Sequence, residues 1–218
     1  VVDAFATPTP SAAVTGAGAS TATPGTAEPA SATGFTWPIE GGCLPEDDNL
    51  LPGAPRPYRD GVHEGVDFYD ADNCTLIGID TEVLAAKAGT VVRADVDYQD
   101  LTPQELAELD ARVANGEAND PDVLDAFRGR QIWIDHGGGV VTRYVHLNGV
   151  AEGIEEGTAV QGGDLIGYVG ESGSPESVTD PGTETHLHFE IRVDEGYLGE
   201  GLPPDEVRDL YEQAFGVE

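Results

Sequence analysis

Hydrophobic and polar residues alternate along several short stretches of the chain, and glycines separate these stretches. The clearest examples are VLAAKAGTVVRA, RQIWIDHGGGVVTRYVHL, GDLIGYVG and HLHFEIRV. Alternation with a period of two places one face of a strand against a core, and the frequent valines and isoleucines suit the surface of a sheet. The pattern predicts a mainly β fold, built as a twisted antiparallel sheet with a smaller second layer, rather than βαβ units.

Two segments interrupt the alternation and predict helices instead. The sequence TPQE at residues 102–105 has the spacing of a capping box with proline at the first helical position, and apolar residues follow at helical spacing. A second short helix is predicted after Asp120-Pro121, so residues 101–128 are expected to form a helical hairpin inserted between two strands. An apolar stripe predicts a last helix within residues 201–218, packed on the domain: Val207, Leu210, Tyr211 and Phe215.

The composition divides the chain into a tether and a folded domain. Residues 1–34 are almost entirely Ala, Thr, Pro, Ser and Gly, so they hold too few large apolar groups to offset the entropy of ordering and are expected to form a flexible tether. The folded domain is expected over residues 35–200. No apolar run approaches the ~20 residues that cross a bilayer. We therefore expect a soluble protein, exported to the cell envelope or the extracellular space, whose signal or anchor lies outside this sequence.

The charge balance argues against one large class of partners. The chain has 41 acidic and only 10 basic residues, which gives a net charge of −31. Such an acidic surface repels nucleic acid and anionic membranes, so neither is expected to bind this chain. We expect the protein to act as a monomer.

The two cysteines, Cys43 and Cys74, lack the CxxC spacing of a zinc knuckle or a redox motif. An even pair in a chain that is expected to be exported favours a disulfide. Closing that loop of about 31 residues would contribute about 3–4 kcal/mol in the chain-entropy model. Two buried free thiols are the alternative.

Two of the five histidines share one predicted strand, in the sequence HLHFEIRV. A strand places His186 and His188 on one face, and the apolar residues between and after them on the other face. The core then fixes the strand while both imidazoles point into a groove. This arrangement suits metal binding or proton transfer.

Two further segments supply side chains of the same kind. In HEGVD, His63 and Asp67 lie four residues apart, and Gly65 lets the backbone turn so that both side chains can reach one ion. Zinc accepts imidazole nitrogen and carboxylate oxygen, and three protein ligands leave one position for water. In RYVHL, alternation places His146 on the opposite side from Val145 and Leu147.

Together these motifs resemble the lysostaphin-type (LytM-like) zinc endopeptidases. The patterns H-x-G-x-D, Y-x-H-L and H-L-H-F-E occur in the family's order, within the similar segments GVHEGVDF, VLAAKAGTVVRA, WIDHGGGVVTRYVHL and VQGGDLIGYVG. The resemblance covers about residues 35–193 apart from the helical insertion. It implies the family's half-barrel sandwich, one Zn²⁺ per chain, and hydrolysis of the peptide cross-links or stem peptides of bacterial peptidoglycan.

Carried over residue by residue, the resemblance implies that His63, Asp67 and His188 bind the metal. It implies that His146 and His186 are the catalytic histidines without a metal bond, which handle the proton and steady the transition state. Bound zinc lowers the pKa of water from about 15.7 to near 7, and a neutral histidine beside that water can accept its proton. Which of the two histidines is the general base stays open at this point.

Other interpretations remain. His136 also matches a recurrent position of the family, and we expect it to be structural or to shape the substrate site. The family contains inactive members that activate other wall hydrolases, but all five expected side chains are present here, which favours activity. A biotinyl or lipoyl carrier domain would use Lys87, but it would need none of the histidines. The helical insertion could form a wall of the cleft, restrict the substrate, dock a partner or only cover a sheet edge.

Overall fold

The computed structural model describes residues 32–57 and 61–217. The predicted tether, residues 1–34, lies outside the described residues apart from its last three positions. Among the described residues no helix has both the length and the apolar character that crossing a bilayer requires.

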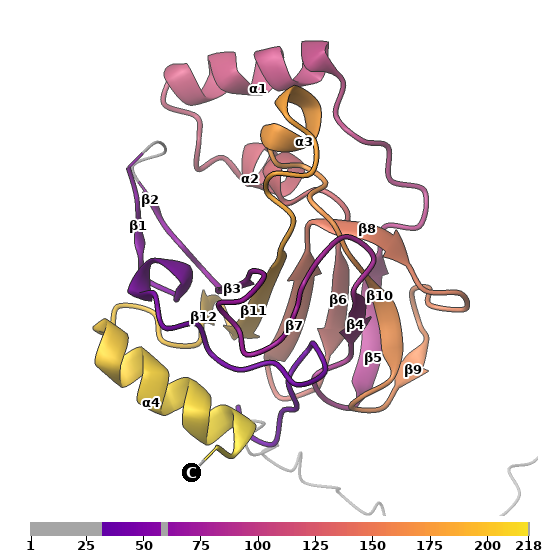
Figure 1. The fold of residues 1–218 in the computed structure, drawn as a ribbon, viewed down its shortest axis with the longest axis vertical. Coiled ribbons are helices and arrows are strands. Elements are labelled where there is room, and N and C mark those ends of the chain that lie inside the picture. Colours follow the sequence, from indigo (N-terminus) through magenta and orange to yellow (C-terminus); the bar gives the residue numbers. More distant parts are fainter. Residues whose placement is uncertain (1–31, 58–60, 218) are drawn as a thin grey trace, which may run out of the picture.

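The largest sheet has seven strands, and every neighbouring pair in it is antiparallel (Figure 1). Its strands follow the spatial order β12-β11-β7-β6-β5-β9, and β3 pairs with β11 beside this path. The bounds are β3 Val66–Phe68, β5 Gly89–Ala94, β6 Ile132–Asp135, β7 Val140–Val145, β9 Ala159–Val160, β11 Leu187–Val193 and β12 Gly196–Tyr197. The mainly β, antiparallel fold predicted from the alternation is confirmed.

Two smaller sheets complete the β structure. Strands β4 (Glu82–Leu84), β10 (Leu165–Val169) and β8 (Leu147–Val150) form a three-stranded antiparallel sheet in the order β4-β10-β8. A two-stranded ribbon pairs β1 (Pro55–Arg56) with β2 (Gly61–Val62). The three-stranded sheet corresponds to the smaller second layer expected from the sequence.

The core explains why the alternating stretches become strands. Large apolar side chains from both sheets are fully buried, among them Phe68, Tyr144, Ile166 and Phe189. Strand β11 differs from the simple alternation, because residues 187–191 are all buried and the polar positions on its second face are covered as well. That buried polar face carries the chemistry described below.

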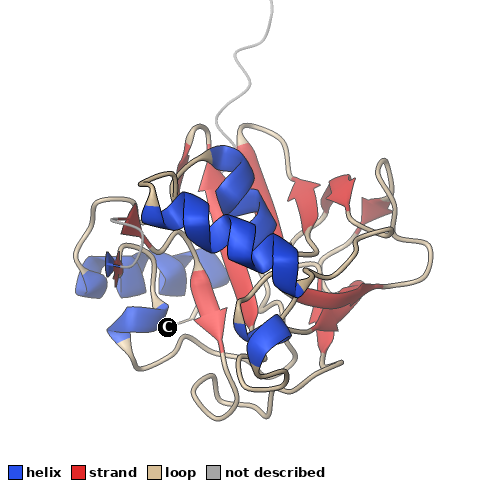
Figure 2. Cartoon of the chain, turned by 90° about the horizontal axis from the view of Figure 1, so that it is seen from above, coloured by secondary structure: helices blue, strands red, loops and turns tan. Residues whose placement is uncertain are grey.

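The helices lie at two ends of the molecule. Helices α1 (Pro103–Ala114), α2 (Pro121–Arg128) and α3 (Glu176–Thr179) gather at one end, and α4 (Pro204–Phe215) packs at the other (Figure 1). Seen from above, helices lie in front and the strands lie behind them (Figure 2). Helix α1 has the predicted capping box, formed by Thr102 and Glu105. The inserted helical hairpin and the C-terminal helix are therefore confirmed, while α3 and the short 3₁₀ helix η1 (Asp48–Leu50) were not predicted.

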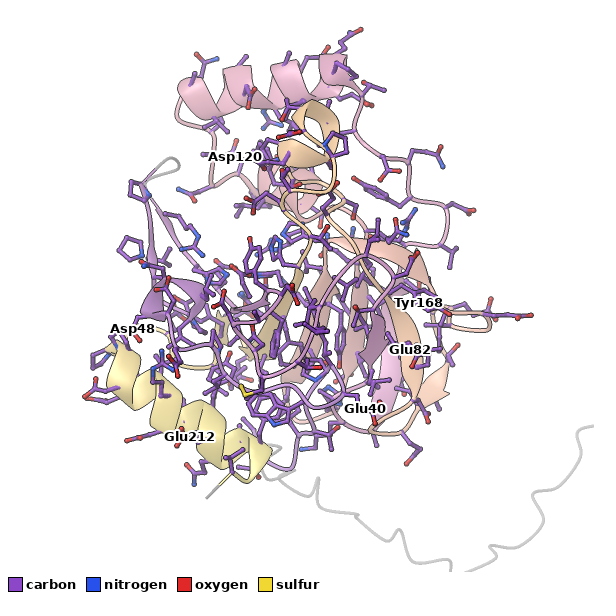
Figure 3. All side chains as sticks on the ribbon, viewed as in Figure 1. Glu40, Asp48, Glu82, Asp120, Tyr168 and Glu212 are labelled. Atoms are coloured by element: carbon purple, nitrogen blue, oxygen red, sulfur yellow. A yellow bond between two sulfur atoms is a disulfide. The ribbon has the colours of Figure 1, made fainter. Side chains whose placement is uncertain are left out.

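The two cysteines form a disulfide, with 5.6 Å between the Cα atoms of Cys43 and Cys74. The figure with all side chains shows its sulfur atoms in yellow (Figure 3). Asn73 holds the same corner, because its side chain donates a hydrogen bond to the Cys43 carbonyl and accepts one from the Tyr69 amide. The disulfide and these hydrogen bonds therefore fix the segment that directly follows β3.

Candidate metal centre and cleft

Three predicted ligands, His63, Asp67 and His188, come together on neighbouring segments. His63 follows β2, Asp67 is the middle residue of β3, and His188 lies opposite Asp67 in the pairing of β3 with β11. His63 Nε2 is 2.9 Å from His188 Nδ1 and 2.9 Å from Asp67 Oδ1. His188 Nδ1 is 2.7 Å from the same carboxylate oxygen. These three side chains can therefore present their ligand atoms to one ion.

Gly65 explains how the two strands approach so closely. A Cβ atom at this position would lie 2.5 Å from the Phe189 carbonyl oxygen and 2.9 Å from the His188 ring. The glycine is required for the close approach of the backbone to β11, and its φ angle is not in the left-handed region. The backbone bends at Gly65, as the sequence interpretation expected, and the close approach to β11 is a second reason for glycine that the sequence did not show.

Hydrogen bonds to the far side of each ring fix which nitrogen faces the ion. The Nδ1–H of His63 donates to the Leu51 carbonyl at 3.1 Å, and because a carbonyl only accepts, Nε2 keeps its lone pair for a metal. The Nε2 of His188 is 3.2 Å from Glu190 Oε1, so Nδ1 is the ligand atom. Such outer contacts orient metal-binding histidines and tune their basicity.

The carboxylate of the trio stays ionised. Burial alone raises the pKa of Asp67, but the charge on His63 and the hydrogen bonds with His188 and His63 lower that pKa well below its usual range. Arg56 Nη2 lies 3.4 Å from Asp67 Oδ2, on the oxygen that the histidines leave open. Asp67 can therefore supply one negative charge to a cation at neutral pH.

His146 lies beside this trio but not within a strand. It occupies the corner between β7 and β8 with a φ of 63°, so the predicted continuation of the strand through His146 was wrong. Its Nδ1–H donates to the Ser172 carbonyl at 2.9 Å, which leaves Nε2 as an acceptor. Burial, helped by the charges on His186 and His188, lowers the pKa of His146 well below its usual range.

His186 adopts the same tautomer on the neighbouring segment. Its Nδ1–H donates to the Glu184 carbonyl at 2.6 Å, and its Nε2 lies 3.9 Å from Asp67 Oδ1. The ring centroid of His186 is 4.7 Å from that of His146. The ring of Tyr69 stacks on the His186 ring, with 4.4 Å between the ring centroids. The Tyr69 hydroxyl donates to the Glu184 carboxylate at 2.8 Å. In both unliganded histidines Nδ1 is therefore engaged with a carbonyl, and Nε2 is the ring nitrogen left for the site.

His136 lies apart from this group. Its Nδ1–H donates to the Ala88 carbonyl at 2.8 Å, and its Nε2 is 2.9 Å from the Thr142 hydroxyl. It is not among the residues that line the cleft. Both ring nitrogens are thus engaged with neighbouring segments of the protein, which supports the structural one of the two roles expected for it.

A cleft of about 590 Å³ contains the four clustered histidines. The helical insertion lines one part of it with apolar side chains: Val113, Ala118, Leu124 and Phe127. Polar side chains from other segments line it too: Arg56, Tyr69 and Glu184. Of the roles left open for the insertion, forming a wall of the cleft is the one that the geometry supports.

Sequence reasoning missed Arg56, Tyr69, Glu190 and Arg128. For Glu190 a signal existed, since it follows His188 by two residues in an alternating strand and so shares its face. Arg56, Tyr69 and Arg128 reach the site from a ribbon, a loop and a helix end, and no local pattern indicates that approach.

The donor set suits zinc. Two imidazole nitrogens and one carboxylate oxygen form a common catalytic zinc set with an open fourth position. Metal bonds of about 2.0–2.2 Å would place tetrahedral ligand atoms about 3.3 Å apart. The ligand atoms here lie 2.7–2.9 Å apart, so a shift of a few tenths of an ångström accommodates the ion. The residues therefore fit the metal that the sequence resemblance implies.

Comparison with known proteins assigns the family. The sequence profile of Peptidase family M23 matches residues 61–199, which is more than half of the chain. The chain belongs to this family. The match spans the whole clustered site, from His63 to His188, together with the helical insertion.

One curated relative is a DD-carboxypeptidase/endopeptidase, Mpg, of Neisseria meningitidis serogroup B. It is 32% identical over 106 residues, which cover 44% of this chain and only 22% of the relative. The chain thus spans about a fifth of that relative's length.

Solved structures with a similar chain path include two peptidases. A zinc-containing peptidase from Vibrio cholerae has a TM-score of 0.48 at 20% identity, covering 78% of this chain and 40% of that one. The catalytic domain of lysostaphin from Staphylococcus simulans has a TM-score of 0.40 at 21% identity, covering 75% of this chain and 82% of that one. The SpoIIQ–SpoIIIAH pore-forming complex has a TM-score of 0.46 at 21% identity, covering 77% and 88%.

Proposed function

We propose that this protein is a zinc-dependent endopeptidase that hydrolyses the peptide cross-links or stem peptides of bacterial peptidoglycan. The observation that carries the proposal is a single constellation: a His-Asp-His trio with converging ligand atoms, beside two histidines whose Nδ1 atoms are held by carbonyls so that Nε2 is left for the site. Membership in Peptidase family M23 supports the peptidase class. The proposed location is the cell envelope or the extracellular space.

The hydrogen bonds of the rings indicate which atoms would bind the metal. We assign His63 Nε2, Asp67 Oδ1 and His188 Nδ1 to the metal, because the other nitrogen of each ring is engaged elsewhere. When bound, zinc supplies a Lewis acid that polarises the scissile carbonyl and brings the pKa of a water molecule near 7.

The protein's own contribution to proton transfer comes from His146 and His186. A neutral imidazole can accept a proton from the attacking water and return it to the leaving amine. His146 is neutral at physiological pH because its pKa is lowered by burial. Its Nδ1–H bond to Ser172 leaves Nε2 as the acceptor, and its ring centroid lies 4.7 Å from that of His186 and 6.1 Å from that of His188. We assign His146 as the base and His186 as the partner that steadies the developing charge.

The substrate class is proposed from the family and from the curated relative, which is named a DD-carboxypeptidase/endopeptidase. The cleft has a volume of about 590 Å³, so it can admit a short peptide. Its apolar wall from the helical insertion would contact the peptide on one side.

Mass analysis of fragments released from defined muropeptides tests the proposal. Zinc-loaded protein is expected to cleave a cross-linked dimer into monomers, which identifies the bond, whereas a carboxypeptidase would release only a terminal residue. His188→Ala is expected to lose both zinc and cleavage. Undiminished cleavage by zinc-free His188→Ala protein would contradict the mechanism.

A non-catalytic module of the same fold is the second candidate. The observation that favours it is the likeness in chain path to a SpoIIQ–SpoIIIAH complex, in which one protein binds another. Zinc content does not separate the two functions, because an inactive protein can still bind metal. Product release does, since the module releases none.

A carrier domain is disfavoured by the surroundings of Lys87. Its ammonium donates to the Thr33 carbonyl at 2.7 Å and lies 4.9 Å from the centre of the Phe35 ring. A modified lysine has to reach a partner enzyme freely. The family assignment points the same way.

A further inference from the structure

We propose that Arg128, the last residue of the helical insertion, is a positioning residue that orients both His188 and His146. The insertion then supports the histidines of the metal centre and also forms a wall of the cleft. This inference rests on the proposed function, because it concerns the histidines assigned there to the metal and to proton transfer.

The main chain of Arg128 holds His146. The His146 N–H donates to the Arg128 carbonyl at 3.1 Å, which satisfies an amide that has left the regular pairing of β7. Helix α2 ends at Arg128, and Gly129 follows with a φ of 65°. A Cβ atom on Gly129 would lie 2.2 Å from the Ser172 carbonyl oxygen, the same oxygen that accepts the His146 Nδ1–H. The end of α2 is therefore packed directly against the support of His146.

The side chain of Arg128 reaches the other histidine through a carboxylate. Its Nε donates to Glu190 Oε1 at 3.0 Å, and its Nη2 donates to Glu64 Oε2 at 2.7 Å. Glu190 Oε1 is also the atom 3.2 Å from His188 Nε2. One oxygen thus joins the guanidinium of the insertion to the imidazole assigned to the metal.

Glu190 needs this partner because its side chain is fully buried, with an exposed fraction of 0%. A buried carboxylate is strongly unfavourable unless it is paired and hydrogen-bonded. Two arginines from the sheet, Arg143 and Arg192, contact the second oxygen, Oε2, at 3.2 and 3.3 Å. Arg128 is the cation on Oε1, so it determines where the oxygen that faces His188 lies.

The geometry explains how this affects the metal. A carboxylate hydrogen-bonded to a ligating histidine fixes the tautomer and the ring orientation, and loss of such an outer partner weakens metal affinity by roughly 10–100-fold. Without the Arg128 guanidinium, no arginine holds Oε1, so its position relative to His188 Nε2 is less firmly fixed. The main-chain bond to His146 survives any substitution of the side chain, so the two effects of Arg128 can be separated.

The test compares two matched substitutions within the insertion, Arg128→Gln and Arg112→Gln. Arg112 joins the insertion's own residues through Glu117, Asp120 and Asp122 and contacts none of the cluster around Glu190. The measurement is the zinc dissociation constant by competition with a chromophoric chelator. We expect Arg128→Gln to weaken zinc binding by up to the roughly 10–100-fold that loss of the outer carboxylate itself would cause, and Arg112→Gln to stay within about threefold of the unaltered chain.

Two further readouts separate positioning from folding. Arg128→Lys keeps the charge but lacks the planar fork, so its zinc affinity should fall between those of Arg128→Gln and the unaltered chain. The visible spectrum of the cobalt-substituted protein should shift in Arg128→Gln and not in Arg112→Gln. If Arg128→Gln fails to fold, the comparison of Arg128→Lys with Arg112→Gln decides.

An Arg128→Gln protein that binds zinc as tightly as the unaltered chain, with an unchanged cobalt spectrum, overturns this inference and leaves the proposed function intact. Equal losses in Arg128→Gln and Arg112→Gln would also overturn it, because they would indicate general loosening of the insertion. An unaltered chain that binds no zinc overturns the proposed function and this inference together.

Discussion

Asp67 and His188 lie directly opposite one another in the antiparallel pairing of β3 with β11, with Oδ1 and Nδ1 2.7 Å apart. The register of two strands that are 121 positions apart in the chain therefore sets the distance between two proposed metal ligands. A shift by one residue would turn one of the two side chains to the other face of the sheet. The site depends on this strand pairing.

Substitution of Gly65 by alanine should disturb that pairing. The added Cβ would meet the Phe189 carbonyl oxygen at 2.5 Å, so β3 must move away from β11. We expect Gly65→Ala to lower the free energy of unfolding by about 1–3 kcal/mol, measured by urea denaturation, and to weaken zinc binding. Gly78→Ala is the matched control, because nothing lies within 4 Å of its added Cβ. Equal behaviour of the two variants would contradict this account.

Zinc binding should release one proton at neutral pH. Burial lowers the pKa of His188, but hydrogen bonds with Asp67 and Glu190 outweigh it and raise the pKa to about 9 in the metal-free site. The pKa of Asp67 is lowered and so is that of His63, so neither holds a proton at pH 7.

Below about pH 9 the metal must therefore displace the proton of His188, and zinc affinity should rise about tenfold per pH unit from pH 7 until it levels off near pH 9. Calorimetry in buffers of different ionisation enthalpy counts the released protons. If zinc binding released no proton at pH 7, His188 would already be neutral at that pH, which would contradict this prediction.

Removal of the proposed base should separate catalysis from metal binding. His146→Gln is expected to lower kcat by about 10²–10⁴-fold while zinc stays bound, because His146 is assigned no metal bond. His136→Gln, in contrast, should reduce thermal stability through its lost bonds to Ala88 and Thr142 and leave kcat of the folded protein nearly unchanged. Zinc content, kcat and the melting temperature of each variant provide the check. Loss of zinc in His146→Gln would reassign that residue to the metal.

Removal of the disulfide should lower stability without touching the site. Replacing Cys43 and Cys74 by alanine releases a loop with a sequence separation of 31 residues. We expect the free energy of unfolding to fall by about 3–4 kcal/mol in chemical denaturation, with zinc affinity retained. A loss below about 1 kcal/mol would mean that Asn73 and its neighbours hold this corner by themselves.

Local patterns in the sequence were sufficient to predict the main elements: the alternation predicted the mainly β fold, and the capping box with apolar residues at helical spacing predicted the inserted helices. The HLHFE strand shows what a local sequence pattern does not predict. It placed His186 and His188 on one face, but it did not show that Glu190 is fully buried, since the arginines that pair with it come from three separate elements. The left-handed corner at His146 was equally hidden, because the carbonyl that accepts its N–H comes from the end of α2, a distant part of the sequence.

The most direct test of the central claim measures zinc content and muropeptide cleavage on the same preparations of the unaltered chain and His188→Ala. The account predicts one zinc per chain and release of cross-link fragments for the unaltered protein, and neither for His188→Ala. A His188→Ala protein that carries no zinc yet cleaves muropeptides at the unaltered rate would contradict it.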